Sequence, residues 1–144
     1  MELYVADASV GAKWFLEEEL EDEARQLFNL LKEKKARIVV PELFYVEMGS
    51  ILRRRVQRRT IRYQHASRIQ DELTKLPLER YSDHELSDVA LENAVQFAIS
   101  IYDAIYLSLA EIYAAPLVTA DDVLIKTCKN RFDFILPLRE FGEG

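Results

Sequence analysis

Cysteine, histidine, glycine and proline are all scarce in this 144-residue chain. A single cysteine, Cys128, excludes a disulfide within the chain and fits a reducing cell interior. We expect Cys128 to be a small core residue. With four glycines and four prolines, no Pro/Gly/Ser-rich linker divides the sequence. Because 49% of the residues are hydrophobic, one core can form, and we expect a single domain over residues 1–144.

The sequence also lacks the patterns of two common enzyme classes and of a membrane protein. His65 and His84 match no zinc-ligand spacing and no Ser-His-Asp arrangement, so both are expected at the surface. The N-terminal segment, residues 1–7, has no basic region and meets Asp7 after a short apolar run. We therefore expect neither a signal peptide nor a membrane span, and a cytoplasmic location.

Basic residues are outnumbered by acidic ones, and the net charge is −6. This charge by itself argues against non-specific nucleic-acid binding. Acid is concentrated at residues 17–23, however, while residues 53–68 carry seven arginines and no acid. Four of them follow helical spacing at i, i+3, i+4 and i+7: Arg55, Arg58, Arg59 and Arg62. Such a stripe can follow a phosphate backbone; the alternative is a solvated helix face that pairs with the acids of residues 17–23.

Short β-type segments alternate with longer segments of helical period. Strands are expected at residues 3–6, 37–40 and 116–119, with a weaker one at 134–136. Helices are expected at residues 21–34, 42–59, 62–75, 102–110 and 121–129, with a further one that Ser82 or Asp83 caps. Pro41 is expected to open the helix at 42–59. This alternation predicts an α/β fold with a central, mostly parallel sheet flanked by helices.

Asp7 and Asp121 each follow an expected strand and precede a helical segment. In a parallel sheet, ligands bind in the crevice beyond the carboxyl ends of the strands, so the two carboxylates are expected to face each other there. Nearby helix N-termini would favour their ionised forms and suit a divalent cation. The alternative is that each residue only caps its helix.

Glu47 and Asp103 lie on the apolar stripes of their helices. The i±4 neighbours of Glu47 are Leu43 and Ile51, and those of Asp103 are Ile99 and Leu107. Isolated buried carboxylates are costly, so four such positions in one small chain predict convergence on a shared cation. The alternatives are a buried Glu47–arginine pair and an N-cap role for Asp103 after a break near Ser100.

These motifs together resemble the PIN-domain ribonucleases, specifically toxins of the VapC type. The resemblance rests on strand-Asp7-x-Ser9, on Pro41 followed six residues later by Glu47, and on the segments at residues 102–110 and 117–121. It spans almost the whole chain, although Ser50 stands where an Asn often follows the helical Glu. It implies a three-layer PIN-like fold and a catalytic quartet, Asp7, Glu47, Asp103 and Asp121, that binds Mg²⁺ or Mn²⁺. Ser9 and Thr119 would be polar supports, and Asp122 an auxiliary residue.

The resemblance implies a metal-dependent endoribonuclease that hydrolyses RNA phosphodiester bonds as the toxin of a toxin–antitoxin pair. An all-oxygen site suits Mg²⁺ or Mn²⁺ better than zinc, and a metal-activated water would attack the phosphorus. The family further implies an antitoxin protein whose tail covers the active site, and a homodimer built from helices. The arginine stripe would then guide RNA toward the acids.

Three other interpretations are open to the sequence. A receiver domain also binds Mg²⁺ at strand ends, but it needs an acidic pair near the N-terminus, whereas the pair Asp121-Asp122 comes last here. A non-catalytic module could use the same fold to bind RNA or protein, with the acids as helix caps. A PIN nuclease could also serve RNA processing, although the small, undecorated domain favours a toxin.

Overall fold

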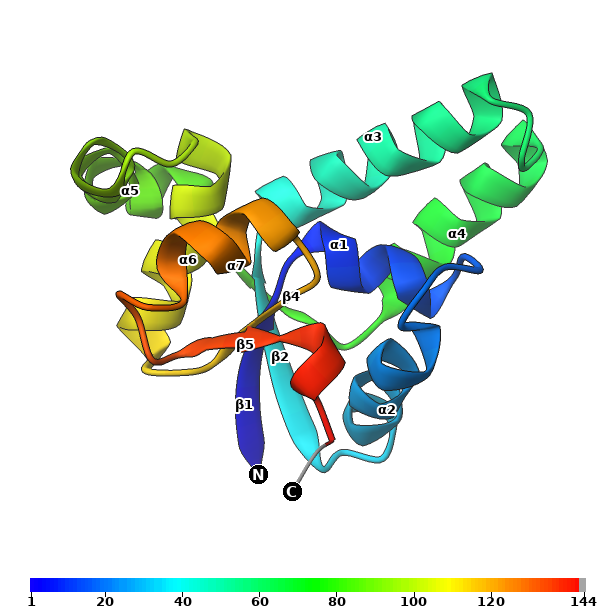
Figure 1. Cartoon of the computed structure of the whole chain (residues 1–144). Coiled ribbons are helices and arrows are strands. Elements are labelled where there is room, and N and C mark those ends of the chain that lie inside the picture. The colour runs from blue at the N-terminus through cyan, green and yellow to red at the C-terminus, as the bar shows by residue number, and fades with distance from the viewer. Residues whose placement is uncertain (143–144) are drawn as a thin grey trace.

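The computed structural model describes residues 1–142, which are built around one five-stranded sheet (Figure 1). The described strands are β1 (Glu2–Ala6), β2 (Ala36–Pro41), β3 (Glu79–Tyr81), β4 (Leu117–Thr119) and β5 (Ile135–Pro137). All of their pairings are parallel, and their order across the sheet is β3-β2-β1-β4-β5. The predicted α/β class with a parallel sheet is therefore confirmed.

Helices cover both faces of this sheet and make it the middle of three layers. The helical elements are α1 (Ala8–Gly11), η1 (Ala12–Trp14), α2 (Glu21–Lys32), α3 (Leu43–Gln57), α4 (Tyr63–Lys75), α5 (Asp83–Phe97), α6 (Ile101–Tyr113), α7 (Asp122–Cys128) and η2 (Leu138–Glu140). Helix α6 packs against β1, β2 and β4, with α5 outside it, and α2 contacts β2 (Figure 1). Strand β4 is wholly buried, as a parallel strand covered on both faces should be.

The position of β1 determines where a ligand site can form. Strand β1 is central, with β2 and β3 on one side and β4 and β5 on the other, so the chain builds the sheet outward from β1 in both directions. Such a reversal opens a crevice beyond the carboxyl ends of the strands. Asp7 directly follows β1, and Asp121 comes two residues after β4. The topology therefore places both carboxylates at this crevice.

Helix α3 is held close to the crevice by a contact that only glycine permits. A Cβ atom on Gly11 would lie 2.6 Å from the Phe44 ring and 3.3 Å from the Met48 sulfur. Phe44 and Met48 are fully buried on α3, so the absence of a side chain at Gly11 lets α1 and α3 pack directly. This contact brings Glu47, the residue before Met48, near the end of β1.

Several details differ from the sequence-based expectations. Strand β3 and the short α1 were not predicted, and Pro41 ends β2 instead of opening a helix. Helix α3 begins at Leu43, whose backbone N–H donates to Asp83 Oδ1 at 3.1 Å, and it ends at Gln57, two residues before the expected end. Ser82 precedes α5 but makes no side-chain capping bond.

Within residues 1–142, no single helix is long and apolar enough to cross a membrane. Helices α5 and α6 reach the necessary length and apolar composition only together, and the two helices are bent by 113° relative to each other.

Candidate active site

The four predicted acids line one hollow of about 200 Å³ at the carboxyl edge of the sheet. They come from four separate places in the chain: Asp7 after β1, Glu47 on α3, Asp103 on α6 and Asp121 before α7. The other polar side chains that line the hollow are Ser9, Ser50, Arg54 and Tyr106. Residues that are 114 positions apart in the sequence thus face one small volume.

Asp7 is the most deeply placed of the four acids and is 6% exposed. The Ser9 hydroxyl donates to its Oδ1 at 2.5 Å, the Thr119 hydroxyl donates to its Oδ2, and the Val10 backbone N–H donates to Oδ1 at 3.3 Å. Burial raises the pKa of Asp7 to about 6, although these hydrogen bonds lower it; the charge of Asp121 raises it further. Asp7 is therefore rigidly held and costly to ionise.

Asp121 caps α7 and is tied to Asp7 through their shared polar neighbours. Its Oδ1 accepts from the backbone N–H groups of Val123 and Leu124, at 2.9 and 3.2 Å. Its own N–H donates to the Thr119 hydroxyl at 3.0 Å, the same hydroxyl that donates to Asp7. Both Asp7 and Asp121 are thus helix caps, as the alternative interpretation held. Capping uses only part of the acceptor capacity of each carboxylate, and both still face the hollow.

Glu47 and Asp103 are half-buried, and their environments disfavour ionisation. Burial raises the pKa of Glu47, as do the charges of Asp103, Asp121 and Asp83, while Tyr106 lowers it. Burial and the charge of Asp121 also raise the pKa of Asp103, and Ser100 lowers it. Among residues 1–142, Glu47 forms no ion pair with arginine, so that alternative is wrong. Asp103 is not the N-cap of α6 either, because Ser100 accepts from its N–H at 3.0 Å.

The donor set suits a hard divalent cation. It consists of carboxylate oxygens, with hydroxyl groups behind them and no sulfur or imidazole. Burial, and in addition the charges of neighbouring acids, raises the pKa of Asp7, Glu47 and Asp103, and a bound cation would offset both effects. In the described part of the chain, no three acidic, histidine or cysteine side chains are yet close enough to hold an ion. Side-chain rotation would have to bring them together.

Three further side chains in the hollow were not among the predicted site residues. Tyr106 is buried and lines the hollow together with Glu47, whereas Ser50 and Arg54 are exposed at the edge of the hollow. The Arg54 Nη1 donates to Ser50 Oγ at 3.4 Å. Helical spacing could have identified them, because Ser50 and Arg54 lie three and seven residues after Glu47, and Tyr106 lies three after Asp103.

Other predicted residues lie outside the hollow. Asp122 is exposed in the first turn of α7 and does not line it. His65 and His84 are exposed and Cys128 is fully buried, so these three predictions are confirmed.

The expected arginine stripe is wrong in its geometry. Helix α3 ends at Gln57, so Arg58, Arg59 and Arg62 lie at the turn into α4 and not on one helix. Arg59 there has φ +61°. Arg55 instead donates to Glu18 at 3.0 Å and to the Glu17 carbonyl at 3.2 Å, as the pairing alternative predicted.

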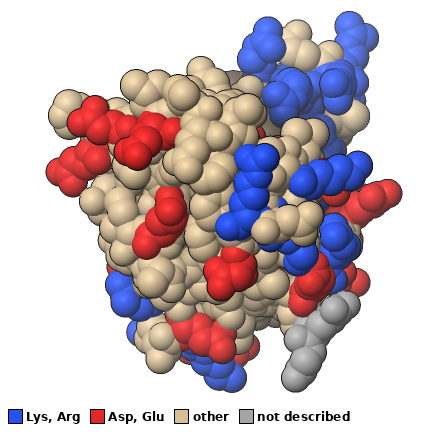
Figure 2. All heavy atoms as spheres, turned by 60° about the vertical axis from the view of Figure 1, so that its left-hand side comes forward, with Lys and Arg blue, Asp and Glu red and all other residues tan. Residues whose placement is uncertain are grey.

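The remaining arginines still form a basic region. Figure 2 shows Lys and Arg gathered where the α3–α4 hairpin projects from the body of the molecule. Its exposed members are Arg53, Arg54, Arg58, Arg59, Arg62 and Arg68. We call this set the hairpin arginines. It begins at the acidic hollow, because Arg54 lines it, and extends outward from there.

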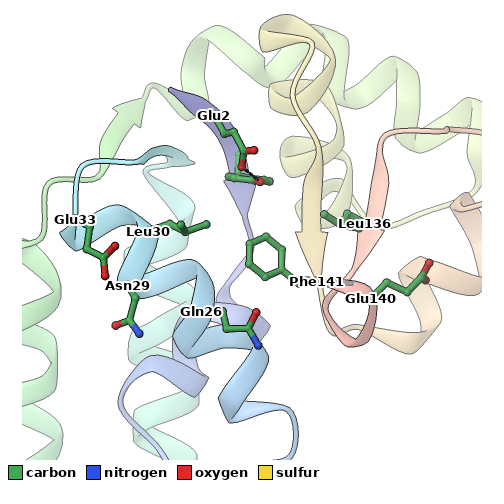
Figure 3. A pocket seen from close by; sticks show the side chains of 10 residues that line it. Glu2, Gln26, Asn29, Leu30, Glu33, Leu136, Glu140 and Phe141 are labelled. Carbon is green, nitrogen blue, oxygen red and sulfur yellow. Dashed lines mark hydrogen bonds between the residues drawn. The ribbon is translucent and has the colours of Figure 1, made fainter. Parts of the chain in front are cut away.

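A larger hollow of about 560 Å³ lies at the opposite end of β1, beside Glu2. Figure 3 shows Phe141 in its centre, between Leu30 of α2 and Leu136 of β5, with Glu2, Glu33 and Glu140 around it. The Tyr4 ring packs edge-on against Phe141 at 5.5 Å. None of the four predicted acids lines this hollow, so its size does not indicate the active site.

Comparison with known proteins agrees with the architecture. A family model described as the PIN domain matches residues 4–130. No match is found among curated proteins.

Three solved structures are similar in fold. PAE2754 from Pyrobaculum aerophilum superposes with a TM-score of 0.70 and 23% identity, over 96% of this chain and 85% of that one. VapBC2 from Rickettsia felis, bound to a DNA fragment from its promoter, superposes with a TM-score of 0.62 and 15% identity, over 89% of this chain and 94% of that one. VapC20 from Mycobacterium tuberculosis, a toxin that cleaves the sarcin-ricin loop, superposes with a TM-score of 0.63 and 12% identity, over 87% of this chain and 95% of that one. At these identities the likeness concerns the fold.

Proposed function

Because this chain belongs to the PIN-domain family, we propose that it is a Mg²⁺- or Mn²⁺-dependent endoribonuclease that acts as the toxin of a toxin–antitoxin pair. The observation that carries this proposal is the convergence of Asp7, Glu47, Asp103 and Asp121 on one hollow at the carboxyl edge of the sheet. No ion pair among residues 1–142 includes any of the four, so none of these carboxylates is paired with a cation of the chain itself.

The four acids would hold the cation in different ways. Asp7, which is fixed by Ser9 and Thr119, would be the rigid ligand, and Asp121 is oriented by the N-terminus of α7. Glu47 on α3 and Asp103 on α6 would rotate inward to complete the site. The chemistry that a bound Mg²⁺ or Mn²⁺ supplies is activation of a water for attack on phosphorus and stabilisation of charge on the phosphate.

The hairpin arginines would position the RNA backbone. Arg54 shares the hollow with the acids, and Arg58 lies one helical turn, about 6 Å, further along the same side of the chain. Arg62 follows at the start of α4. An acidic protein can thereby present a local positive surface beside a negative metal site. Arg55, held by Glu18, would contribute least.

Partner binding is supported by apolar surface near the site. A groove of about 370 Å³ between α3 and α4 is lined by Leu52, Val56 and Tyr63, among others, and it suits a segment of an antitoxin protein. Helices α5 and α6 expose Leu91, Val95 and Ile112, which favours a homodimer built from helices. The structural neighbours include a VapBC assembly and a toxin, which is consistent with a toxin that binds an antitoxin.

Controlled expression in a bacterial host, followed by sequencing of RNA ends, tests the toxin role. We expect growth arrest and a small set of new cleavage sites, both absent with Asp7→Asn. Cleavage limited to maturation of precursor RNA, with normal growth, would instead favour the RNA-processing nuclease. Neither growth arrest nor new RNA ends would favour the non-catalytic module.

Removing Arg58 and Arg62 should weaken RNA binding without affecting metal binding. Each contact with a phosphate of single-stranded RNA contributes roughly 0.7 to the slope of log affinity against log salt, so Arg58→Ala/Arg62→Ala should flatten that slope by about 1.4. The measurement is a salt series of RNA affinity in the cleavage-deficient Asp7→Asn background. The matched control is Arg25→Ala/Lys32→Ala, which removes two exposed charges on a different helix, α2. An unchanged slope would assign these arginines to a protein partner.

A further inference from the structure

Tyr106 is the buried polar group in the hollow that the proposed function leaves unused. Its side chain is 2% exposed, on α6, three residues after Asp103. Its hydroxyl has no hydrogen-bond partner among residues 1–142, and only one other buried side-chain atom, Gln70 Oε1, shares that condition there. A buried hydroxyl without a partner costs free energy, so a group that is kept in this state calls for an explanation.

The surroundings of the Tyr106 hydroxyl indicate its partner. The side chain lines the same hollow as Glu47, and the charge of Glu47, after burial, is the main influence that raises the pKa of Tyr106. The hydroxyl in turn lowers the pKa of Glu47. The two groups are thus within electrostatic reach, although they do not complete a hydrogen bond in this arrangement.

We propose that the Tyr106 hydroxyl is a positioning group that donates a hydrogen bond to the Glu47 carboxylate and fixes the oxygen that Glu47 presents to the cation. This inference rests on the proposed metal site. Asp7 already has such support from Ser9 and Thr119, and Asp121 has it from the backbone of α7. Glu47 has no other hydrogen-bond donor among the described residues, so Tyr106 supplies the equivalent support.

The test compares Tyr106→Phe with wild type by two measurements: calorimetric titration with Mn²⁺ at pH 7.5, and thermal unfolding without metal. Loss of a group that orients a metal ligand weakens metal binding by about 10- to 100-fold, which is the expected loss here. The metal-free variant should unfold at the same temperature or higher, because phenylalanine fills the site without the unpartnered hydroxyl. Tyr113→Phe, on the same helix but packed against Tyr81, is the matched control with wild-type affinity.

A second comparison shows whether Tyr106 acts through Glu47. In a Glu47→Gln background, Tyr106→Phe should have no further effect on Mn²⁺ affinity, since the group that it orients is already altered. Additive losses would overturn the proposal, as would wild-type affinity in Tyr106→Phe or a lower unfolding temperature with unchanged affinity. If wild type itself binds no Mn²⁺, the metal site fails and this inference fails with it. If wild type binds Mn²⁺ and Tyr106→Phe binds it with the same affinity, the proposed metal site stands and only the role of Tyr106 fails.

Discussion

Asp7→Asn should lose at least about 100-fold in metal-dependent RNA cleavage. Groups that only orient a ligand cost 10- to 100-fold when they are removed, and Asp7 is proposed as a ligand itself. The variant keeps the shape of the side chain and one acceptor oxygen, so the contacts with Ser9 and Val10 can persist. Initial rates on a single-stranded RNA at saturating Mn²⁺ measure the effect. Asp88→Asn, an exposed site on α5, makes the same chemical change and should cleave at the wild-type rate.

The free energy of unfolding of Asp7→Asn distinguishes a loss of activity from a loss of folding. Burial raises the pKa of Asp7 to about 6 in the folded protein, against about 3.9 unfolded, so metal-free wild type loses stability as the pH rises from 4 through 6. Asparagine does not titrate. At pH 4 the two proteins should therefore differ little, whereas at pH 7.5 Asp7→Asn should be more stable by up to about 3 kcal/mol. Urea unfolding in EDTA at both pH values measures this difference, and a variant that is less stable at pH 7.5 would contradict it.

Removal of divalent metal should abolish cleavage by the wild-type protein. The acceptor groups of the hollow are mainly carboxylates, with no histidine among its lining residues, so the proposed cleavage depends on a metal that activates water. Cleavage should stop in excess EDTA and return when Mn²⁺ or Mg²⁺ is added in excess. If a metal-activated water is the nucleophile, as proposed, the products should carry 5′-phosphate and 3′-hydroxyl ends, also on a substrate with a 2′-deoxy group at the cut site. A 2′,3′-cyclic phosphate would show a different mechanism.

Most of the sheet could be predicted from the sequence because its central strands are short apolar runs bounded by polar residues. Strand β3, by contrast, consists of Glu79, Arg80 and Tyr81 and lies at the sheet edge. It forms through pairing with β2 and through the Arg37–Glu79 ion pair, with Nε–Oε2 at 2.6 Å, a contact between distant residues. The α1 segment was missed because it has only four residues, and it depends on the Asp7 cap and on burial against α3.

The acids could be predicted because each breaks an apolar pattern or follows an apolar run. Their convergence depends on the strand order, which no local pattern specifies. The sequence-based prediction placed the end of α3 two residues too late for a different reason. Arg59 adopts a left-handed conformation that usually belongs to glycine, with the Thr60 N–H donating to the Arg55 carbonyl at 3.0 Å, so the usual glycine signal for a helix end is absent.

Calorimetric titration of Mn²⁺ into metal-free wild type and Asp7→Asn, at pH 7.5, tests most directly whether the acids form a metal site. We expect saturable binding by wild type and at least about a 100-fold weaker affinity in Asp7→Asn, while the exposed-site control Asp88→Asn binds as wild type does. Equal Mn²⁺ affinity in wild type and Asp7→Asn would contradict the assignment of the hollow as a metal centre.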